Sequence, residues 1–463
     1  GWTNEKCMVP VTSVGDDRSV PPWVPADMGP DPRVGKDLPT IAALCSSYFP
    51  GSHSQHTVDR FLMGYEYDGQ FHYPPFRVVS LFVDRPHAER ELSARRAEQF
   101  DLQIYQDIAG ALTLGTGKLA VDYVLLVCEN GEYPKNDRGA ILYPRYEFFQ
   151  EMIDVFRASG RSVPVFNDKH LSYDWLQAKI MYEQQQEFGF PMLAGSSLPV
   201  TWRLPDLEFP VGCEIDEAVV AYPGDVESYG IHALETLQCM VERRGSGESG
   251  IRRVQCLQGA AVWEAADAGD WSRKLLDEAL GRSLPRSIVE RQRTWSAQEL
   301  ARASAQYSPQ QPSLEAVVEN PTALLVEYRD GLRAACINLQ SHVQDFTFAA
   351  RRTDGHVDST LFFLGGPPES GYHGIQVHHI EELFVTGEAN YPLERTLLTT
   401  GALAFLMESL PDQRWVETPE LAIEYQAPAA SQHAKGLLPL HCPWSRHGLF
   451  EPAARAMGIW PDE

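Results

Sequence analysis

The 463-residue sequence lacks several patterns that would place it in a common class of protein. No apolar run reaches about 18 residues, so no membrane-spanning helix is predicted. Positive charge is scarce, because 39 Lys and Arg stand against 63 Asp and Glu, for a formal net charge of −24. Such a balance argues against nucleic acid or an anionic membrane as a partner, since both repel an acidic protein. It leaves room for a locally basic site that binds a small anion.

Paired cysteines are absent as well. The eight cysteines are scattered singly and form no C-x-x-C motif, which argues against a zinc ribbon or a thioredoxin-like motif. Cys45 and Cys128 fall in apolar runs, where a free thiol behaves as a small hydrophobe. This usage favours a reducing compartment, and we expect a cytoplasmic protein, although a removed export signal would leave no trace.

The common hydrolase signatures are missing too. The sequence has neither the G-x-S-x-G turn of serine hydrolases nor the H-E-x-x-H helix of zinc proteases. We therefore expect no bound metal. One alternative stays open: His53 and His56 lie three residues apart at a helix start, near Asp59, and positions i and i+3 share a helix face.

What is present is an ordinary globular composition, with 43% hydrophobic residues and enough length for two domains. Between residues 38 and 190, apolar strand-like runs alternate with segments of helical period. The runs are Pro39–Ser47, Arg77–Asp84, Val121–Cys128 and Val163–Asn167. Alternation of this kind predicts an α/β fold with a Rossmann-like, doubly wound parallel sheet.

The pattern changes in the next region, 191–375. After a helix near residues 229–241, strand-like runs follow one another without helices, for example at 323–328, 331–338 and 346–352. Consecutive strands predict an α+β domain built on a large open antiparallel sheet. The remaining parts are a proline-rich N-terminal arm (1–37), helices that return to the first domain (376–410) and a wrapping C-terminal tail (411–463). We interpret the Arg-, Ser- and Gln-rich stretch 283–315 as an insertion.

Two short stretches resemble one enzyme family. Asp168-Lys169-His170 ends the fourth apolar run, at the edge where parallel sheets bind ligands. It resembles the Glu-Lys-Pro signature of the glucose–fructose oxidoreductase, inositol dehydrogenase and MocA (Gfo/Idh/MocA) family. The stretch from Ser228 to Glu235 resembles the Asp-x-Gly-x-His-x-x-Asp element of the same family, with His232 in the place of its histidine.

The resemblance implies an NAD(P)-dependent oxidoreductase that acts on a sugar, a polyol or a related hydroxy compound. In that family the histidine is the general acid/base, and the lysine contacts both the nicotinamide ribose and the substrate hydroxyl. A histidine suits this work because its usual pKa of about 6.5 makes both forms available near neutrality. The expected catalytic residues are therefore Lys169 and His232, with Asp168 and Glu227 beside them.

The cofactor site departs from the family. Asp84 ends the second apolar run, where a dinucleotide fold places the carboxylate that binds the adenine ribose. The first turn should read G-x-G-x-x-G but has Gly51 alone, and we expect Tyr48 and Phe49 to obstruct the approach of a pyrophosphate. NAD or NADP is still the expected cofactor. Its expected contacts are Ser47, Gly51, Ser52, His53, Asp84, Glu129 and Lys169.

Substrate contacts are expected from polar and aromatic side chains near these motifs, namely His170, Trp202, Arg203 and Asn136. The expected partners are a small-molecule substrate and further copies of the chain, in a homodimer or homotetramer formed through the open sheet. Two other functions stay open. One is a non-redox member of the family, such as a metal-assisted hydrolase, a lyase or an isomerase, with a lost or repurposed nucleotide site. The other is an inert binding protein.

Overall fold

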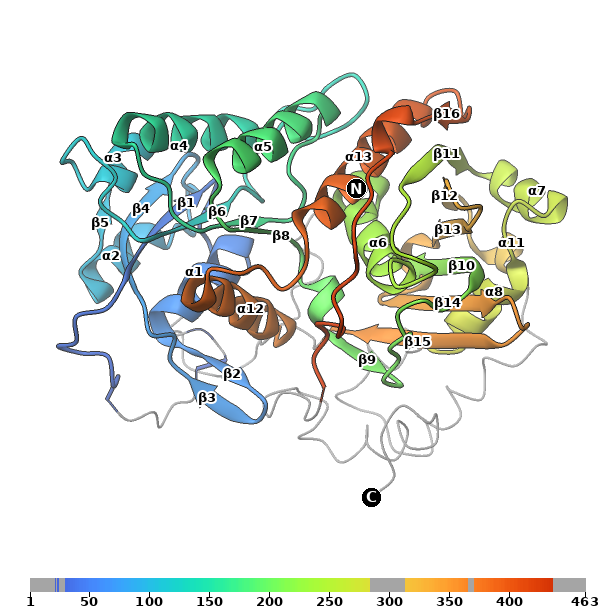
Figure 1. Ribbon diagram of the computed structural model, residues 1–463, viewed down its shortest axis with the longest axis horizontal. Helices are drawn as coiled ribbons and strands as arrows, with labels where there is room; N and C mark the ends of the chain where they lie inside the picture. The colour runs from blue at the N-terminus through green and yellow to red at the C-terminus, as the bar shows by residue number, and fades with distance from the viewer. Residues whose placement is uncertain (1–20, 22, 25–29, 284–312, 365–369, 436–463) are drawn as a thin grey trace.

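The computed structural model describes residues 21, 23–24, 30–283, 313–364 and 370–435. Most of the expected N-terminal arm, most of the expected insertion and the tail beyond residue 435 lie outside these described residues. Two sheets stand side by side, and helix α13 (Leu393–Ser409) runs between them (Figure 1). This helix packs against α5 (Trp175–Phe188), which belongs to the first half of the molecule. It also packs against α6 (Val226–Val241) of the second half, and so it connects the two.

The first sheet is parallel throughout and has six strands in the order β5-β4-β1-β6-β7-β8. Its strands are β1 (Thr40–Cys45), β4 (Arg77–Val83), β5 (Gln103–Ile104), β6 (Tyr123–Val127), β7 (Val165–Asp168) and β8 (Met192–Gly195). Taken in chain order this is the 3-2-1-4-5-6 arrangement of dinucleotide-binding folds, so the expected Rossmann-like sheet is confirmed. The strand order reverses between β1 and β6, and the crevice for a ligand opens at their carboxyl ends.

Helices cover both faces of this sheet. They are α1 (His53–Met63), α2 (Ser93–Phe100), α3 (Ile108–Thr113), α4 (Arg145–Ser159), α5 (Trp175–Phe188) and α12 (Tyr372–Thr386). Side chains alternate along β1, so Ile41 and Ala43 pack under α1 and α12, whereas Ala42 and Leu44 pack under α3 and α4. Burial on both faces explains why the central strands β1 and β6 are apolar at consecutive positions, from Ile41 to Cys45 and from Tyr123 to Val127. A hairpin, β2 (Tyr65–Tyr67) and β3 (Gln70–His72), lies beside α12.

The first sheet extends beyond the expected boundary at residue 190. Strand β8, which pairs with β7, spans Met192–Gly195. This stretch was expected to belong to the second domain, because the alternation of strands and helices ends near Phe190. The next strand, β9 (Trp202–Leu204), already belongs to the second sheet.

The second sheet has eight strands in the order β16-β11-β12-β13-β10-β14-β15-β9. Besides β9 these are β10 (Ile215–Tyr222), β11 (Ile251–Gln258), β12 (Thr322–Tyr328), β13 (Arg333–Asn338), β14 (Phe346–Arg352), β15 (Val357–Phe363) and β16 (Val416–Glu417). Its pairs are antiparallel except β10 with β13. The expected large open sheet is confirmed, and all of its strand pairs but one are antiparallel. The crossover through α6 (Val226–Val241) brings β13 beside β10 in the same direction.

Both faces of the second sheet are covered. Helices α6 and α13 lie on one face, and α7 (Ala260–Ala268) and α8 (Arg273–Leu280) lie on the other. Strand β11 was expected to continue to Trp263, through residues that form the start of α7, and helix α8 was not predicted. Val219, Ala335 and Ile337 are therefore fully buried under this chain's own helices. The sheet face that was expected to pair with further copies of the chain is therefore not exposed at these positions. The homodimer or homotetramer itself stays a prediction.

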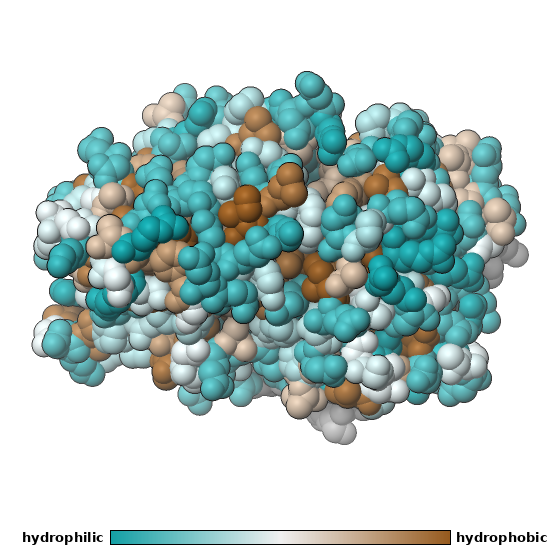
Figure 2. All heavy atoms as spheres, turned by 45° about the horizontal axis from the view of Figure 1, so that its top comes forward, coloured by the Kyte–Doolittle hydropathy of each residue, from teal (hydrophilic) through white to brown (hydrophobic). Residues whose placement is uncertain are grey.

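The remaining short elements are α11 (Leu314–Val317) and the 3₁₀ turns η2 (Leu198–Val200), η3 (Gln340–His342) and η4 (Pro419–Leu421). Among the described helices none is long and apolar enough to cross a membrane. The surface in Figure 2 is mostly hydrophilic, with apolar side chains only in small groups, as the acidic composition leads one to expect.

Candidate functional site

Lys169 is the centre of a buried polar cluster at the carboxyl end of β7. Its backbone has φ +59°, a left-handed conformation that is uncommon outside glycine, and its amide donates to the Gly195 carbonyl of β8 at 3.1 Å. Residues in such conformations persist where the surroundings hold them, and they gather at active sites. The ammonium donates to Glu129 Oε1 at 2.8 Å and to the Ser228 carbonyl at 3.4 Å. Lys169 therefore joins the parallel sheet to the start of α6.

Glu129 neutralises two buried cations. One carboxylate oxygen contacts Lys169, and the other accepts from Arg145, the first residue of α4, whose side chain is fully buried. Burial alone would raise the pKa of Glu129, but the charges of Lys169 and Arg145 outweigh it and hold this pKa below its usual range. Glu129 was expected to contact a cofactor, whereas its observed partners belong to the protein. Nothing in the sequence pointed to Arg145.

His232 lies in α6, one turn after Ser228, and only 12% of its side chain is exposed. Burial, followed by the positive charge of Lys169, lowers its pKa, so the ring is neutral at pH 7. Its Nδ1 is 3.7 Å from Glu235 Oε2, beyond hydrogen-bond distance, and has no partner among the described residues. The structure thus brings the two residues of the sequence motifs together, with the histidine in its basic form.

A second histidine, from the start of helix α1, also lies in the cluster. His53, the first residue of α1, has its Nδ1 2.7 Å from Asp168 Oδ2, and Asp168 is 1% exposed. A carboxylate on Nδ1 orients the ring and leaves Nε2 to exchange a proton. From the sequence, His53 was expected to contact the cofactor and Asp168 to take part in catalysis, and their pairing was not predicted.

His170 and Glu227 lie at the edge of the cluster. His170 is buried with Nε2 3.4 Å from Arg145, and burial followed by the charge of Arg145 keeps its pKa well below the usual value. Glu227 accepts the Ile141 amide at 2.9 Å, and burial raises its pKa. A direct contact between His170 and a substrate therefore stays a prediction, because its ring faces Arg145.

The crevice between β1 and β6 is bridged by the chain itself. The Ser46 hydroxyl donates to the Glu129 carbonyl at 2.9 Å and to the Asn130 carbonyl at 3.0 Å. Asn130 Oδ1 accepts the His53 amide at the start of α1, at 3.0 Å. Asp84, at the end of β4, accepts the Tyr133 hydroxyl at 2.6 Å. Of the groups expected to hold a dinucleotide, the His53 amide, Asp84 and Lys169 each have a partner from the loop after β6.

The first turn differs from the expectation in the direction of its side chains. Tyr48 does not obstruct the crevice, because its ring is fully buried and its hydroxyl donates to Asp59 at 2.5 Å. Gly51 has φ +86°, where glycine is favoured, and Ser52 caps α1 by accepting the Gln55 amide at 3.1 Å. Ser47 is buried behind this turn.

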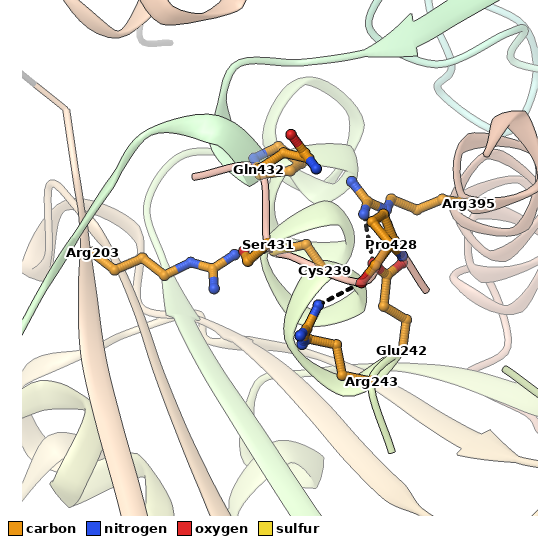
Figure 3. Close-up of a pocket in the computed structure, with 9 residues that line it drawn as sticks. Arg203, Cys239, Glu242, Arg243, Arg395, Pro428, Ser431 and Gln432 are labelled. Atoms are coloured by element: carbon orange, nitrogen blue, oxygen red, sulfur yellow. Dashed lines mark hydrogen bonds and ion pairs between the residues drawn. The ribbon is translucent and has the colours of Figure 1, made fainter. Parts of the chain in front are cut away.

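Three residues expected to contact the substrate are in contact with other parts of the chain. Trp202 is 5% exposed and packs in the core. Asn136 Oδ1 accepts two amides of its own loop, at 3.0 Å each. Arg203 lines a separate pocket beside Cys239 and Arg243, where it donates to the Leu207 carbonyl at 2.9 Å (Figure 3). A contact of these three residues with a substrate stays a prediction, because proximity in sequence to a motif says nothing about side-chain direction.

His56, the second histidine of the metal alternative, is buried against His373, with ring centroids 4.4 Å apart and the rings stacked. Burial keeps the pKa of both histidines well below the usual value. Within the part of the chain that the structure describes, no three metal-ligating side chains group around a common point. The pair His53 and His56 is therefore better explained as one member of the cluster and one core residue.

No protein-family model and no curated protein matches this chain. Solved structures similar to it include GenD2 from gentamicin A biosynthesis in complex with NAD, at 12% identity and TM-score 0.49, covering 82% of this chain and 97% of that one. Another is myo-inositol dehydrogenase from Lactobacillus casei with NAD(H) and myo-inositol, at 11% identity and TM-score 0.47, with coverage of 82% and 97%. A third is biliverdin reductase from Synechocystis sp. PCC 6803 with biliverdin and NADP+, at 12% identity and TM-score 0.44, with coverage of 80% and 98%. Identities and TM-scores this low carry no argument about this chain, and the site described above stands on its own contacts.

Proposed function

We propose that this chain is an NAD(P)-linked oxidoreductase that acts on the hydroxyl group of a sugar, a polyol or a related small molecule. The observation that carries the proposal is the meeting of Lys169 and His232 in one buried cluster, at the carboxyl edge of a parallel sheet with dinucleotide-fold strand order. A buried lysine and a neutral histidine are the groups that an alcohol needs in order to lose its proton.

In the proposed reaction His232 accepts the proton of the substrate hydroxyl at a ring nitrogen. Its lowered pKa keeps it unprotonated at neutral pH, so it is ready to act as a base. The ammonium of Lys169 stabilises the oxygen as negative charge develops on it, and the low surrounding polarity strengthens this effect. Glu129 holds Lys169 in place, and Asp168 orients His53 at the opposite side of the cluster.

The residues at the crevice are of the chemical types that bind a dinucleotide. The Asp84 carboxylate would hold ribose hydroxyls, and the amides at the start of α1 would hold phosphate oxygens, because the helix dipole favours anions there. Lys169 would contact both the nicotinamide ribose and the substrate hydroxyl, as the family resemblance implies. A bound nicotinamide would supply the hydride acceptor for the carbon whose hydroxyl His232 deprotonates.

The test is turnover of a panel of polyols and aldoses with NAD+ or NADP+, followed as absorbance of the reduced nicotinamide. We expect Lys169→Met and His232→Gln each to lower kcat/KM by about 10²- to 10⁴-fold, the usual share of a positioned acid/base group. The matched control is Lys179→Met, a half-exposed lysine on α5 that pairs with Glu183. Turnover that survives Lys169→Met and His232→Gln unchanged would contradict the assigned roles.

A second candidate, isomerisation or elimination without a redox step, is favoured by one specific observation. Two histidines, His53 and His232, flank Lys169, and two acid/base groups suit proton transfer to and from neighbouring carbons. Incubation of the protein with ketoses in deuterated water, without added nucleotide, distinguishes this candidate. Deuterium appearing in the carbon skeleton by NMR, and lost in His53→Gln, would favour it over the oxidoreductase.

A further inference from the structure

Five residues that follow β6, Glu129 to Tyr133, make one continuous set of contacts across the candidate nucleotide site. We call them the crevice segment. Three of their side chains hold the three groups assigned above to a dinucleotide: Glu129 holds Lys169, Asn130 holds the start of α1, and Tyr133 holds Asp84. A chain with no use for the site would not need one segment to satisfy all three groups.

At the phosphate position the segment supplies an oxygen in place of an anion. Asn130 Oδ1 accepts the His53 amide at 3.0 Å. The neighbouring amides are also engaged, since the Ser52 amide donates to the Phe49 carbonyl at 3.0 Å and the Gly51 amide donates to Gln55 Oε1 at 2.6 Å. A helix N-terminus binds an anion through free amides, so Asn130 must move before a phosphate reaches the His53 amide.

At the ribose position the segment supplies a hydroxyl. The Tyr133 hydroxyl donates to Asp84 Oδ2 at 2.6 Å, as a ribose hydroxyl would. The guanidinium of Arg85 lies 4.5 Å from the centre of the Tyr133 ring, which places a flat cation over the aromatic ring. Tyr133 thereby occupies the carboxylate and also covers the surface beside it.

We propose that the crevice segment is an internal ligand of the nucleotide site, and that a dinucleotide binds only after Asn130 and Tyr133 have left it. The inference rests on the proposed function, because it assumes that the site accepts a dinucleotide. An internal ligand lowers the apparent affinity by the fraction of molecules in which the site is open. Removing its contacts therefore tightens the binding of the external ligand.

The test compares four proteins: wild type, Asn130→Ala, Tyr133→Phe and the double variant. Glu129 is left intact, because its removal would strand two buried cations. NADH and NADPH are titrated into each full-length protein and followed by nicotinamide fluorescence. Glu132→Asp is the control, since its exposed side chain lies within the same segment and keeps its charge. Circular dichroism spectra and thermal melts establish that every variant is folded.

We expect the double variant to bind one of the two dinucleotides at least 10-fold more tightly than wild type, with each single variant in between and Glu132→Asp unchanged. Wild type that binds as tightly as the folded double variant would overturn the internal ligand and leave the proposed function standing. Absence of binding to every folded protein would overturn the proposed function, and the inference with it.

Discussion

Replacing Glu129 with glutamine is expected to lower the free energy of unfolding by about 3–5 kcal/mol, the usual loss when one partner of a buried ion pair is removed. Glu129 is 7% exposed, and its carboxylate is shared by Lys169 and by Arg145, which is fully buried. The substitution leaves two cations in the interior without their shared counterion. Urea unfolding at pH 7, followed by circular dichroism, measures the loss. Glu132→Gln, at an exposed position three residues away, is expected to change it by less than about 0.5 kcal/mol.

A double variant separates the ion pair from general damage to the loop. In Glu129→Gln with Lys169→Met, one of the two stranded cations is gone, so part of the lost stability should return. A loss below about 1 kcal/mol in Glu129→Gln alone would show that water reaches Lys169 and Arg145. The cluster would then be less buried than its contacts indicate.

Lowering the pH from 7 to 5.5 is expected to cost roughly 4 kcal/mol of unfolding free energy through three buried histidines. Burial keeps the pKa of His56, His170 and His373 well below the usual value, whereas the unfolded chain takes up protons near pH 6.5. The unfolded state therefore binds more protons below pH 6.5. The stability that these histidines contribute is fully present above that pH and is lost as the pH falls below it.

Urea unfolding at pH 7 and at pH 5.5 measures this dependence. His373→Gln removes one of the three groups and is expected to make the dependence shallower by about a third, at whatever stability the variant has. His356→Gln is the control, because 62% of the His356 side chain is exposed. Equal stability of the wild type at the two pH values would mean that these histidines are protonated in the folded protein.

The parallel sheet was predicted well, because its central strands β1 and β6 are almost entirely apolar and its strands alternate with segments of helical period. Helix α4 (Arg145–Ser159) was predicted with its observed bounds. Prediction failed where the chain changes from strand to helix within one apolar run. Gly259, with φ +64°, ends β11, yet the following Ala-Ala-Val-Trp resembles more strand and forms α7. The parallel pairing of β10 with β13 left no local signal, because it depends on a crossover.

Residues of the candidate cluster were expected together only where they lie in one of the two family-like motifs. Lys169 and His232 were expected from two short stretches, and in the structure Lys169 contacts the Ser228 carbonyl one turn before His232, while their roles stay predictions. The pair of His53 with Asp168 joins residues 115 positions apart, so no spacing rule reveals it. Tyr48 was expected to obstruct a pyrophosphate because of its size, but its hydroxyl points to Asp59, a buried residue of α1. Contacts made across the fold decide such questions, and they are absent from any local pattern.

The most direct test of the account is a crystal structure of the protein grown with NADH. The account predicts a dinucleotide in the crevice between β1 and β6, with its phosphates on the amides of Gly51 to His53 and a ribose on Asp84. Asn130 and Tyr133 would have left their present partners, and the nicotinamide would face Lys169 and His232. A dinucleotide bound elsewhere on the chain, with Asn130 still on the His53 amide and Tyr133 still on Asp84, would contradict it.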